Sequence, residues 1–184
     1  MTEPLFRSTH NALLFAHNFN HAQYEPTILA RLIEKNYKPG KGLAGLDGAG
    51  QSGMILGAVR DIGALEAAFM VMRYAPSHRK CDCKNSCCSG NIINREWSEA
   101  KNYIAGLIQS HGALHGKKHA PQLWSSLVAK TFGFKWSIKE LAEFSGVDRD
   151  TVAEHYAIIK PWIEAREDKA FAAVDARLKR SGMV

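Results

Sequence analysis

The stretch from residue 137 to residue 160, SIKELAEFSGVDRDTVAEHYAIIK, constrains the fold of this chain more than any other segment. Two short helices that cross over a tight turn need small or aliphatic residues where they touch and a flexible residue at the turn. Leu141 and Ala142 supply the inner face of the first helix, and Gly146 tolerates a left-handed turn conformation. Val147 and Val152 supply the contacts back from the second helix. This spacing predicts a helix-turn-helix over 137–160.

The residues after the turn predict which side of the second helix is exposed. We expect Asp148 to be the N-cap of this helix, because a carboxylate there accepts hydrogen bonds from the first free backbone N–H groups. The face that would meet phosphates and base edges consists of Arg149, Asp150, Thr151, Ala153 and Glu154. His155 stands where the motif usually has an aliphatic residue, so we expect it to be partly buried. The alternative for the whole segment is an ordinary helix pair in an all-α core.

Charge is distributed unevenly along the chain, whose formal net charge is +6. Residues 1–72 hold six basic and six acidic side chains, residues 73–135 hold ten and three, and residues 136–184 hold eight and nine. Because Lys and Arg supply most of the affinity for DNA, the middle of the chain is expected to assist binding. The further DNA-binding candidates are lysines of the middle part and of the helix-turn-helix: Lys117, Lys118, Lys135 and Lys139.

The acidic balance of the last segment leaves two hypotheses open for the second helix. Asp150 or Glu154 can accept a hydrogen bond from the amino group of cytosine, which would be base reading in the major groove. An acidic face can equally dock on a protein.

Helical periodicity recurs along nearly the whole chain, and no stretch has convincing strand alternation. Helices are expected over 9–18, 26–36, 48–60, 63–74, 95–111, 121–132 and 161–179, where Pro161 either begins the last helix or kinks a longer one. The predicted fold class is all-α, and its 46% hydrophobic content can bury a sizeable core. The chain is predicted to comprise an N-terminal helical region (1–77), a short cysteine-rich knuckle (78–92) and a C-terminal helical region (93–184) that contains the helix-turn-helix.

The sequence offers little for a membrane or for catalysis. It lacks a run of about 18 apolar residues and a secretion signal at residues 1–11, so a soluble cytoplasmic protein without membrane contact is expected. The glycine-rich segment 39–53 lacks the Gly-Lys-Ser or Gly-Lys-Thr ending of a phosphate-binding loop. The eight histidines are scattered and have no carboxylate pair beside them, so no enzymatic activity is expected. A metal-dependent nuclease built on the basic middle is the alternative.

The four cysteines form one cluster in the order C-x-C-x3-C-C. Thiolates are preferred ligands of Zn²⁺, and a metal could fold a polar segment that has no core of its own. The predicted structural zinc ligands are Cys81, Cys83, Cys87 and Cys88. Three cysteines with one histidine are an alternative set, the histidine being His78, His111, His115 or His119. Reduced structural or redox-active thiols, and disulfides, are the remaining interpretations.

The order of these parts resembles that of the phage Q proteins of the lambda type, which are late-gene transcription antiterminators. These proteins have a helical N-terminal region, a zinc-binding cysteine knuckle and a C-terminal helix-turn-helix. Local likeness runs through Gly42-Leu43-Ala44-Gly45-Leu46-Asp47-Gly48 and through Ile159-Lys160-Pro161-Trp162. The family carries two C-x2-C pairs around an insert, whereas this chain has one compressed cluster.

The resemblance implies a phage-encoded protein that acts in the bacterial cytoplasm without making or breaking a bond. It would bind double-stranded DNA at a late promoter, engage bacterial RNA polymerase and make it read through pauses and terminators. In that scheme the helix bearing Arg149, Asp150, Thr151 and Glu154 reads DNA, and the cysteines hold a zinc knuckle.

Two other functions remain as alternatives. A repressor or activator without antitermination activity would occupy its site, usually as a homodimer on two half-sites. A protein-only interaction module would carry a helix-turn-helix that never touches DNA.

Overall fold

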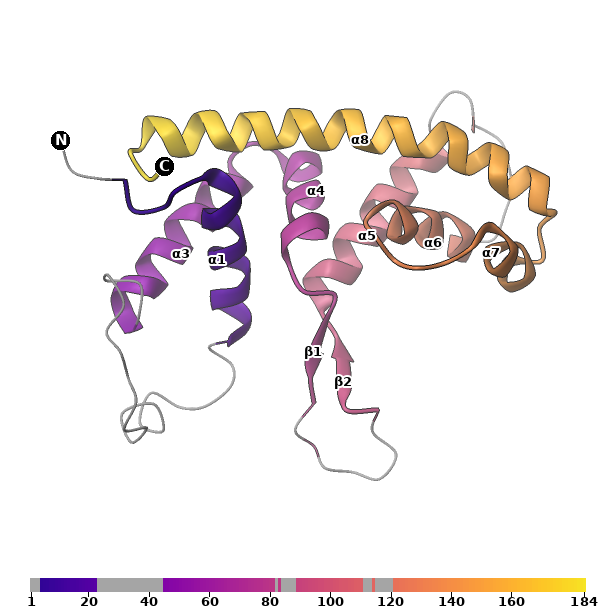
Figure 1. The fold of residues 1–184 in the computed structure, drawn as a ribbon, viewed down its shortest axis with the longest axis horizontal. Helices are drawn as coiled ribbons and strands as arrows, with labels where there is room; N and C mark the ends of the chain where they lie inside the picture. Colours follow the sequence, from indigo (N-terminus) through magenta and orange to yellow (C-terminus); the bar gives the residue numbers. More distant parts are fainter. Residues whose placement is uncertain (1–3, 23–44, 82, 84–88, 111–113, 115–120) are drawn as a thin grey trace.

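A computed structural model of the 184-residue chain describes residues 4–22, 45–81, 83, 89–110, 114 and 121–184 (Figure 1). Several expectations fall outside these residues. They are the helix over 26–36, the lysines Lys117 and Lys118, the cysteines Cys87 and Cys88, and the histidines His111, His115 and His119.

The described part of the chain is mostly helical, which confirms the helical fold class. The helices are α1 (Thr9–Ala22), α3 (Gly45–Arg60), α4 (Ala64–Tyr74), α5 (Arg95–Gln109), α6 (Pro121–Thr131), α7 (Ile138–Ser145) and α8 (Arg149–Arg180). One feature was not predicted from the sequence, an antiparallel ribbon in which β1 (His78–Lys80) pairs with β2 (Asn91–Ile93). Strands of three residues are too short for a recognisable alternation of apolar and polar side chains.

Helix α8 connects the two ends of the molecule. Its 32 residues span about 48 Å, and Figure 1 shows α1, α3 and α4 beneath its C-terminal part and α6 and α7 beneath its N-terminal part. The side chains that it buries recur every three, four or seven residues along one face: Val152, His155, Ile159, Ile163, Ala170, Val174 and Leu178. The apolar ones among them belong to one cluster of buried residues that includes members from both the first and the last third of the chain.

The expectation of a separate helix beginning at Pro161 is wrong, and the other reading, a longer helix that passes through this proline, is correct. Pro161 is exposed, whereas Ile159 and Ile163 on either side of it are buried. Proline removes one backbone donor from a helix but leaves the packing of its neighbours possible. The buried isoleucines therefore hold the helix together across a residue that would end an isolated one.

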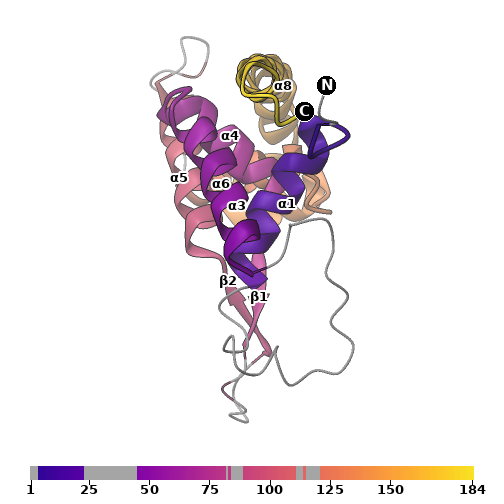
Figure 2. The ribbon, with the colours of Figure 1, turned by 90° about the vertical axis from the view of Figure 1, so that its left-hand side faces the viewer.

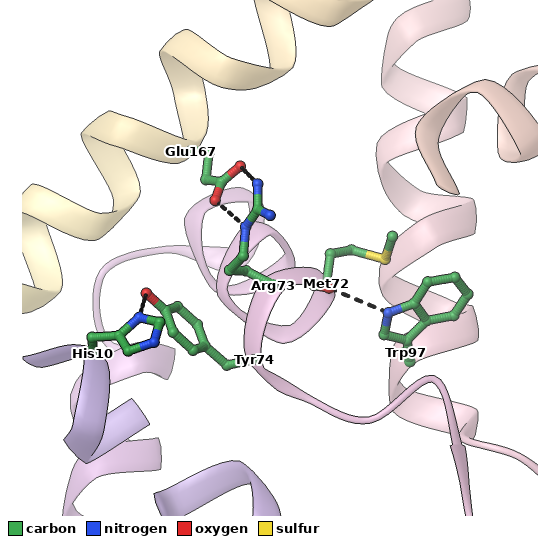
Figure 3. A network of polar contacts seen from close by, with 6 residues as sticks. All are labelled: His10, Met72, Arg73, Tyr74, Trp97 and Glu167. Atoms are coloured by element: carbon green, nitrogen blue, oxygen red, sulfur yellow. Dashed lines mark hydrogen bonds and ion pairs between the residues drawn. The ribbon is translucent and has the colours of Figure 1, made fainter. Parts of the chain in front are cut away.

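Polar contacts join the helices that surround α4 (Figure 3). Arg73 on α4 makes a bidentate ion pair with Glu167 on α8, and this hydrogen bond raises the pKa of the guanidinium. The hydroxyl of Tyr74 lies 3.3 Å from Nδ1 of His10 on α1. On α5, Nε1 of the buried Trp97 donates a hydrogen bond to the carbonyl oxygen of Met72 at 3.3 Å. These contacts fix α4 between the N-terminal helix and the two later ones.

The β1–β2 ribbon projects away from the helices in both views (Figures 1 and 2). Its register pairs His78 with Ile93, Arg79 with Ile92, and Lys80 with Asn91. Beyond the strands, the backbone N–H of Cys81 donates to the carbonyl oxygen of Gly90 at 2.9 Å. Cys81 thus lies directly beyond the last paired residues of the ribbon. Among the described residues, no helix is both long and apolar enough to cross a membrane.

Candidate nucleic-acid interface

Helix α7 begins with a capping box. The hydroxyl oxygen of Ser137 accepts a hydrogen bond from the backbone N–H of Glu140 at 3.1 Å, and Oε2 of Glu140 accepts one from the backbone N–H of Ser137 at 2.7 Å. This reciprocal pair satisfies two backbone donors that a helix start leaves open. The bonds from the Ser137 backbone and hydroxyl lower the pKa of Glu140. The Glu140 carboxylate is therefore charged at neutral pH, and its negative charge interacts favourably with the positive, N-terminal end of the helix dipole.

The turn and the second helix follow the sequence prediction. Gly146 ends α7 in the left-handed conformation, with φ 66° and ψ 21°. Two residues later, Oδ1 of Asp148 accepts hydrogen bonds from the backbone N–H groups of Asp150 at 2.8 Å and Thr151 at 3.3 Å. The predicted turn glycine and N-cap are confirmed, and together they determine where α8 begins.

The inner side of this helix pair is packed as the sequence predicts. Leu141 on α7 and Val152 on α8 have no exposed surface, and Ala142 and Val147 are partly buried against the core. His155 is more buried than we expected, with 1% of its surface exposed. Its ring stacks on that of Trp124 from α6, with centroids 5.2 Å apart and planes 4° apart. A third helix, α6, therefore supports the helix-turn-helix from inside.

The outer side presents the predicted contact residues to solvent. Arg149, Asp150, Ala153 and Glu154 are exposed, and Thr151 is partly exposed. Of the further DNA-binding candidates, Lys135 and Lys139 are also exposed, and Nζ of Lys139 lies 3.9 Å from a carboxylate oxygen of Glu143. The start of α8 is thus an accessible helix terminus with mixed charge.

The charge of this surface is nearly balanced. Residues 135–160 hold four basic and five acidic side chains, so the helix-turn-helix has no positive surplus of its own. A positive pair lies on β1 instead, where Arg79 and Lys80 are exposed. The exposed positive pair and the exposed side chains at the start of α8 therefore lie on different elements.

An aromatic pair on this face was not among the sequence predictions. Phe144 on α7 keeps 57% of its surface exposed, and the ring of Trp136 meets it edge-on, with centroids 5.3 Å apart. Phe144 follows the buried Leu141 by three residues, so helical periodicity would place it in the core. Only the neighbouring elements decide that it is exposed. A single exposed apolar side chain is common on protein surfaces, so Phe144 is a candidate contact residue and does not by itself define an interface.

The predicted zinc site is described only in part. Cys81 is partly buried at the end of β1 and Cys83 is exposed, while Cys87 and Cys88 lie outside the described residues. Across the ranges that the structure describes, no three or more histidine, cysteine or acidic side chains are grouped as metal ligands would be. Since half of the thiols are outside those ranges, zinc binding stays a prediction. The hairpin is compatible with it, because the Cys81–Gly90 hydrogen bond closes the segment that bears the cysteines.

Comparison with known protein families, with curated proteins and with solved structures finds no match.

Proposed function

We propose that this protein is a DNA-binding transcription regulator that inserts the start of α8 into the major groove. One observation carries the proposal. A left-handed glycine and a capping aspartate join α7 to α8 so that the first two turns of α8 expose their outer side chains. A helix held in this way is the element that helix-turn-helix proteins place against base edges.

The exposed side chains have the chemistry for reading bases. Arg149 can donate two hydrogen bonds to guanine, and Asp150 or Glu154 can accept one from the amino group of cytosine. Thr151 can contact either a base or a phosphate. Lys135 and Lys139 are exposed cations of the same unit and can contact phosphates. Because the face has almost no net charge, it would contribute more to sequence specificity than to the electrostatic affinity for DNA.

Within this class we propose the finer role that the resemblance to lambda-type Q proteins implies. The protein would bind double-stranded DNA at a late promoter and then act on bacterial RNA polymerase so that it passes pauses and terminators. A zinc-bound cysteine knuckle on the β1–β2 hairpin belongs to this proposal. It rests on the order of the parts and on the two short stretches of similar sequence.

A second candidate function is docking on a protein through the same unit. The exposed Phe144 beside Trp136, together with the balanced charge, favours it. Aromatic side chains are enriched at the centres of protein interfaces, and a face without net charge has little attraction for phosphates. A protein-only module would bind no DNA in a salt-dependent manner, which separates it from the first proposal.

The DNA proposal is tested by selecting duplexes from a random library and measuring their dissociation constants. Arg149→Ala should weaken binding to the selected duplex by about 1–3 kcal/mol and leave binding to unselected duplexes much less changed. Lys169→Ala is the matched control, because Lys169 is an exposed cation on the far half of the same helix. An equal loss on every sequence would contradict base reading by Arg149.

Antitermination is tested by transcription in vitro with purified bacterial RNA polymerase. The template would carry a candidate late promoter, either with or without the selected duplex sequence beside it, and a terminator downstream. Read-through that requires both the protein and that sequence supports antitermination. A change in initiation with unchanged termination would assign the protein to the repressors or activators instead.

A further inference from the structure

The β1–β2 hairpin is an exposed arm beside the helices that make up most of the described residues. It projects from the helices in both views (Figures 1 and 2), and all six strand residues are exposed. Ile92 and Ile93 retain 39% and 60% of their surface. A two-stranded ribbon with no buried face gains little stability from the hydrophobic effect, so packing against the described parts of the chain does not explain its apolar side chains.

The base of the arm is firmly attached. The side-chain amide of the buried Asn94 donates to the carbonyl oxygen of Pro76 at 2.7 Å, and its backbone N–H donates to that of Ser77 at 2.9 Å. The side-chain oxygen of Asn94 also caps α5 by accepting from the backbone N–H of Glu96 at 3.1 Å. The arm is therefore fixed at its base to a helix of the core, while its strand residues are exposed.

Positive charge and hydrogen-bonding groups cover both faces of the arm. Successive strand residues alternate between faces, so Arg79 and Ile92 share one face while Lys80, Asn91, His78 and Ile93 share the other. The second face is hollowed between His78, Ser89, Asn91 and Ile93. Within the described ranges, no carboxylate lies within ion-pair distance of Arg79 or Lys80. Both charges are therefore available to an anionic partner.

We propose that the β1–β2 hairpin is a second DNA contact, in which Arg79 and Lys80 neutralise phosphates of the duplex that α8 reads. The inference rests on the proposed function and supplies what the near-neutral helix-turn-helix lacks. A two-stranded β-ribbon has the width to enter the major groove of DNA, and a fixed, basic one can follow the phosphates at the groove edge. The isoleucine on the face that enters the groove then lies against the sugars and bases.

The test is the salt dependence of duplex binding by the full-length protein. Dissociation constants for a labelled duplex, both selected and unselected in sequence, are measured from about 50 mM to about 200 mM NaCl. The double variant Arg79→Ala with Lys80→Ala should reduce the slope of log Kd against log salt by about 1 to 2, because each phosphate contact contributes about 0.9. The reduction should be the same on both duplexes, since phosphates carry no sequence information.

Two further variants make the test specific. Arg60→Ala with Lys169→Ala removes one arginine and one lysine, both exposed, from helices α3 and α8, and should leave the slope unchanged. Arg79→Lys keeps the charge on β1 and should keep the slope, which separates lost charge from a damaged hairpin. Circular dichroism checks that each variant is as helical as the parent.

The outcomes distinguish the hairpin from α8. In one outcome, the salt slope of Arg79→Ala with Lys80→Ala equals that of the control double variant while Arg149→Ala still loses selectivity. In that case the hairpin contact is overturned and recognition by α8 stands. If the slope falls with the hairpin charges but no sequence preference exists, the hairpin contact stands and reading by α8 fails. A loss that occurs only with single-stranded RNA or with RNA polymerase as the probe would overturn the assignment to duplex DNA.

Discussion

Gly146 and Asp148 set the junction between α7 and α8 by different physical means. Gly146 has a φ of 66°, and a Cβ added there would meet no atom within 4 Å. Glycine is therefore favoured at this position by the left-handed backbone conformation, which costs other residues about 1–2 kcal/mol. Asp148 acts through its side chain, which accepts two backbone hydrogen bonds at the start of α8. The two residues fix the chain direction without depending on any distant contact.

The capping box at Ser137 and Glu140 predicts a pH dependence of stability. The pKa of Glu140 lies below its ordinary value of 4.5 because the Ser137 backbone N–H, and then its hydroxyl, bond the charged form. A carboxylate whose pKa is lower in the folded state stabilises the fold above its unfolded pKa, and this contribution is lost as the pH falls through the folded pKa. Urea unfolding between about pH 6 and pH 3 should therefore show a smaller acid loss of stability for Glu140→Gln than for the parent.

The control for that measurement is Glu143→Gln, a change on the same helix outside the capping box. It should reproduce more of the parent's pH dependence than Glu140→Gln does. If Glu140→Gln and the parent lose stability equally on acidification, the carboxylate does not hold the cap in solution.

At the scale of elements, the continuity of α8 depends on packing that overcomes its own proline. Pro161 has no N–H, so the carbonyl oxygen of Ala157 lacks the usual intrahelical donor. Replacing Pro161 by alanine should restore this bond and raise the free energy of unfolding by about 1–3 kcal/mol, since Pro161 is exposed. Urea unfolding measures the change. Lys169→Ala, which also introduces an alanine on the exposed side of α8, is the control and should change the free energy of unfolding much less. If Pro161→Ala leaves the free energy of unfolding unchanged, the helix already compensates for the proline.

A second prediction concerns Cys83, beyond the end of β1, and rests on the proposal that the cysteines bind zinc. Cys83→Ser should lower the zinc content of the purified protein, because a serine hydroxyl does not replace a thiolate as a ligand. Amide hydrogen exchange should then speed up over the hairpin more than over α7 and the start of α8.

Metal content by atomic mass spectrometry is the primary measurement for that variant. Ser89→Ala is the matched control, because Ser89 is an exposed residue of the same segment without a metal-ligating group. Zinc content that is the same in Cys83→Ser as in the parent would remove Cys83 from the ligands.

On the scale of the whole molecule, α8 couples helices from both ends of the chain. It contacts α1, α3 and α4 as well as α6 and α7, and one buried cluster runs beneath it. Arg177 near its end pairs with Asp61, and Oγ1 of Thr9 donates to the carboxylate of Asp175 at 2.6 Å. These contacts predict that the described helices unfold together.

Leu178→Ala tests this coupling. Leu178 is fully buried near the end of α8, so the cavity should cost about 2–5 kcal/mol. All four tryptophans lie after residue 92, far along the chain from α1 and α3. Their fluorescence and the circular dichroism of the whole chain should nevertheless shift to the same lower urea concentration. Met54→Ala, at a side chain that is 54% exposed, is the control. Two separate transitions would indicate that the two ends fold independently.

Features that arise within a few residues can be predicted from the amino-acid sequence. The position of most helices follows from periodicity, and the turn at Gly146 and the cap at Asp148 follow from the conformational range and side-chain chemistry of single residues. These features depend on atoms separated by at most one helical turn, so a linear pattern contains them.

Features that depend on distant partners are visible only in the assembled fold. The fold stacks His155 on Trp124 and pairs β1 with β2, so that residues distant in sequence come into contact. It also leaves Phe144 largely uncovered, so that this side chain is exposed. The passage of α8 through Pro161 belongs to the same class, because buried side chains stabilise the helix on both sides of it. Burial is a property of the assembled core, and no local pattern specifies which neighbours will cover a given side chain.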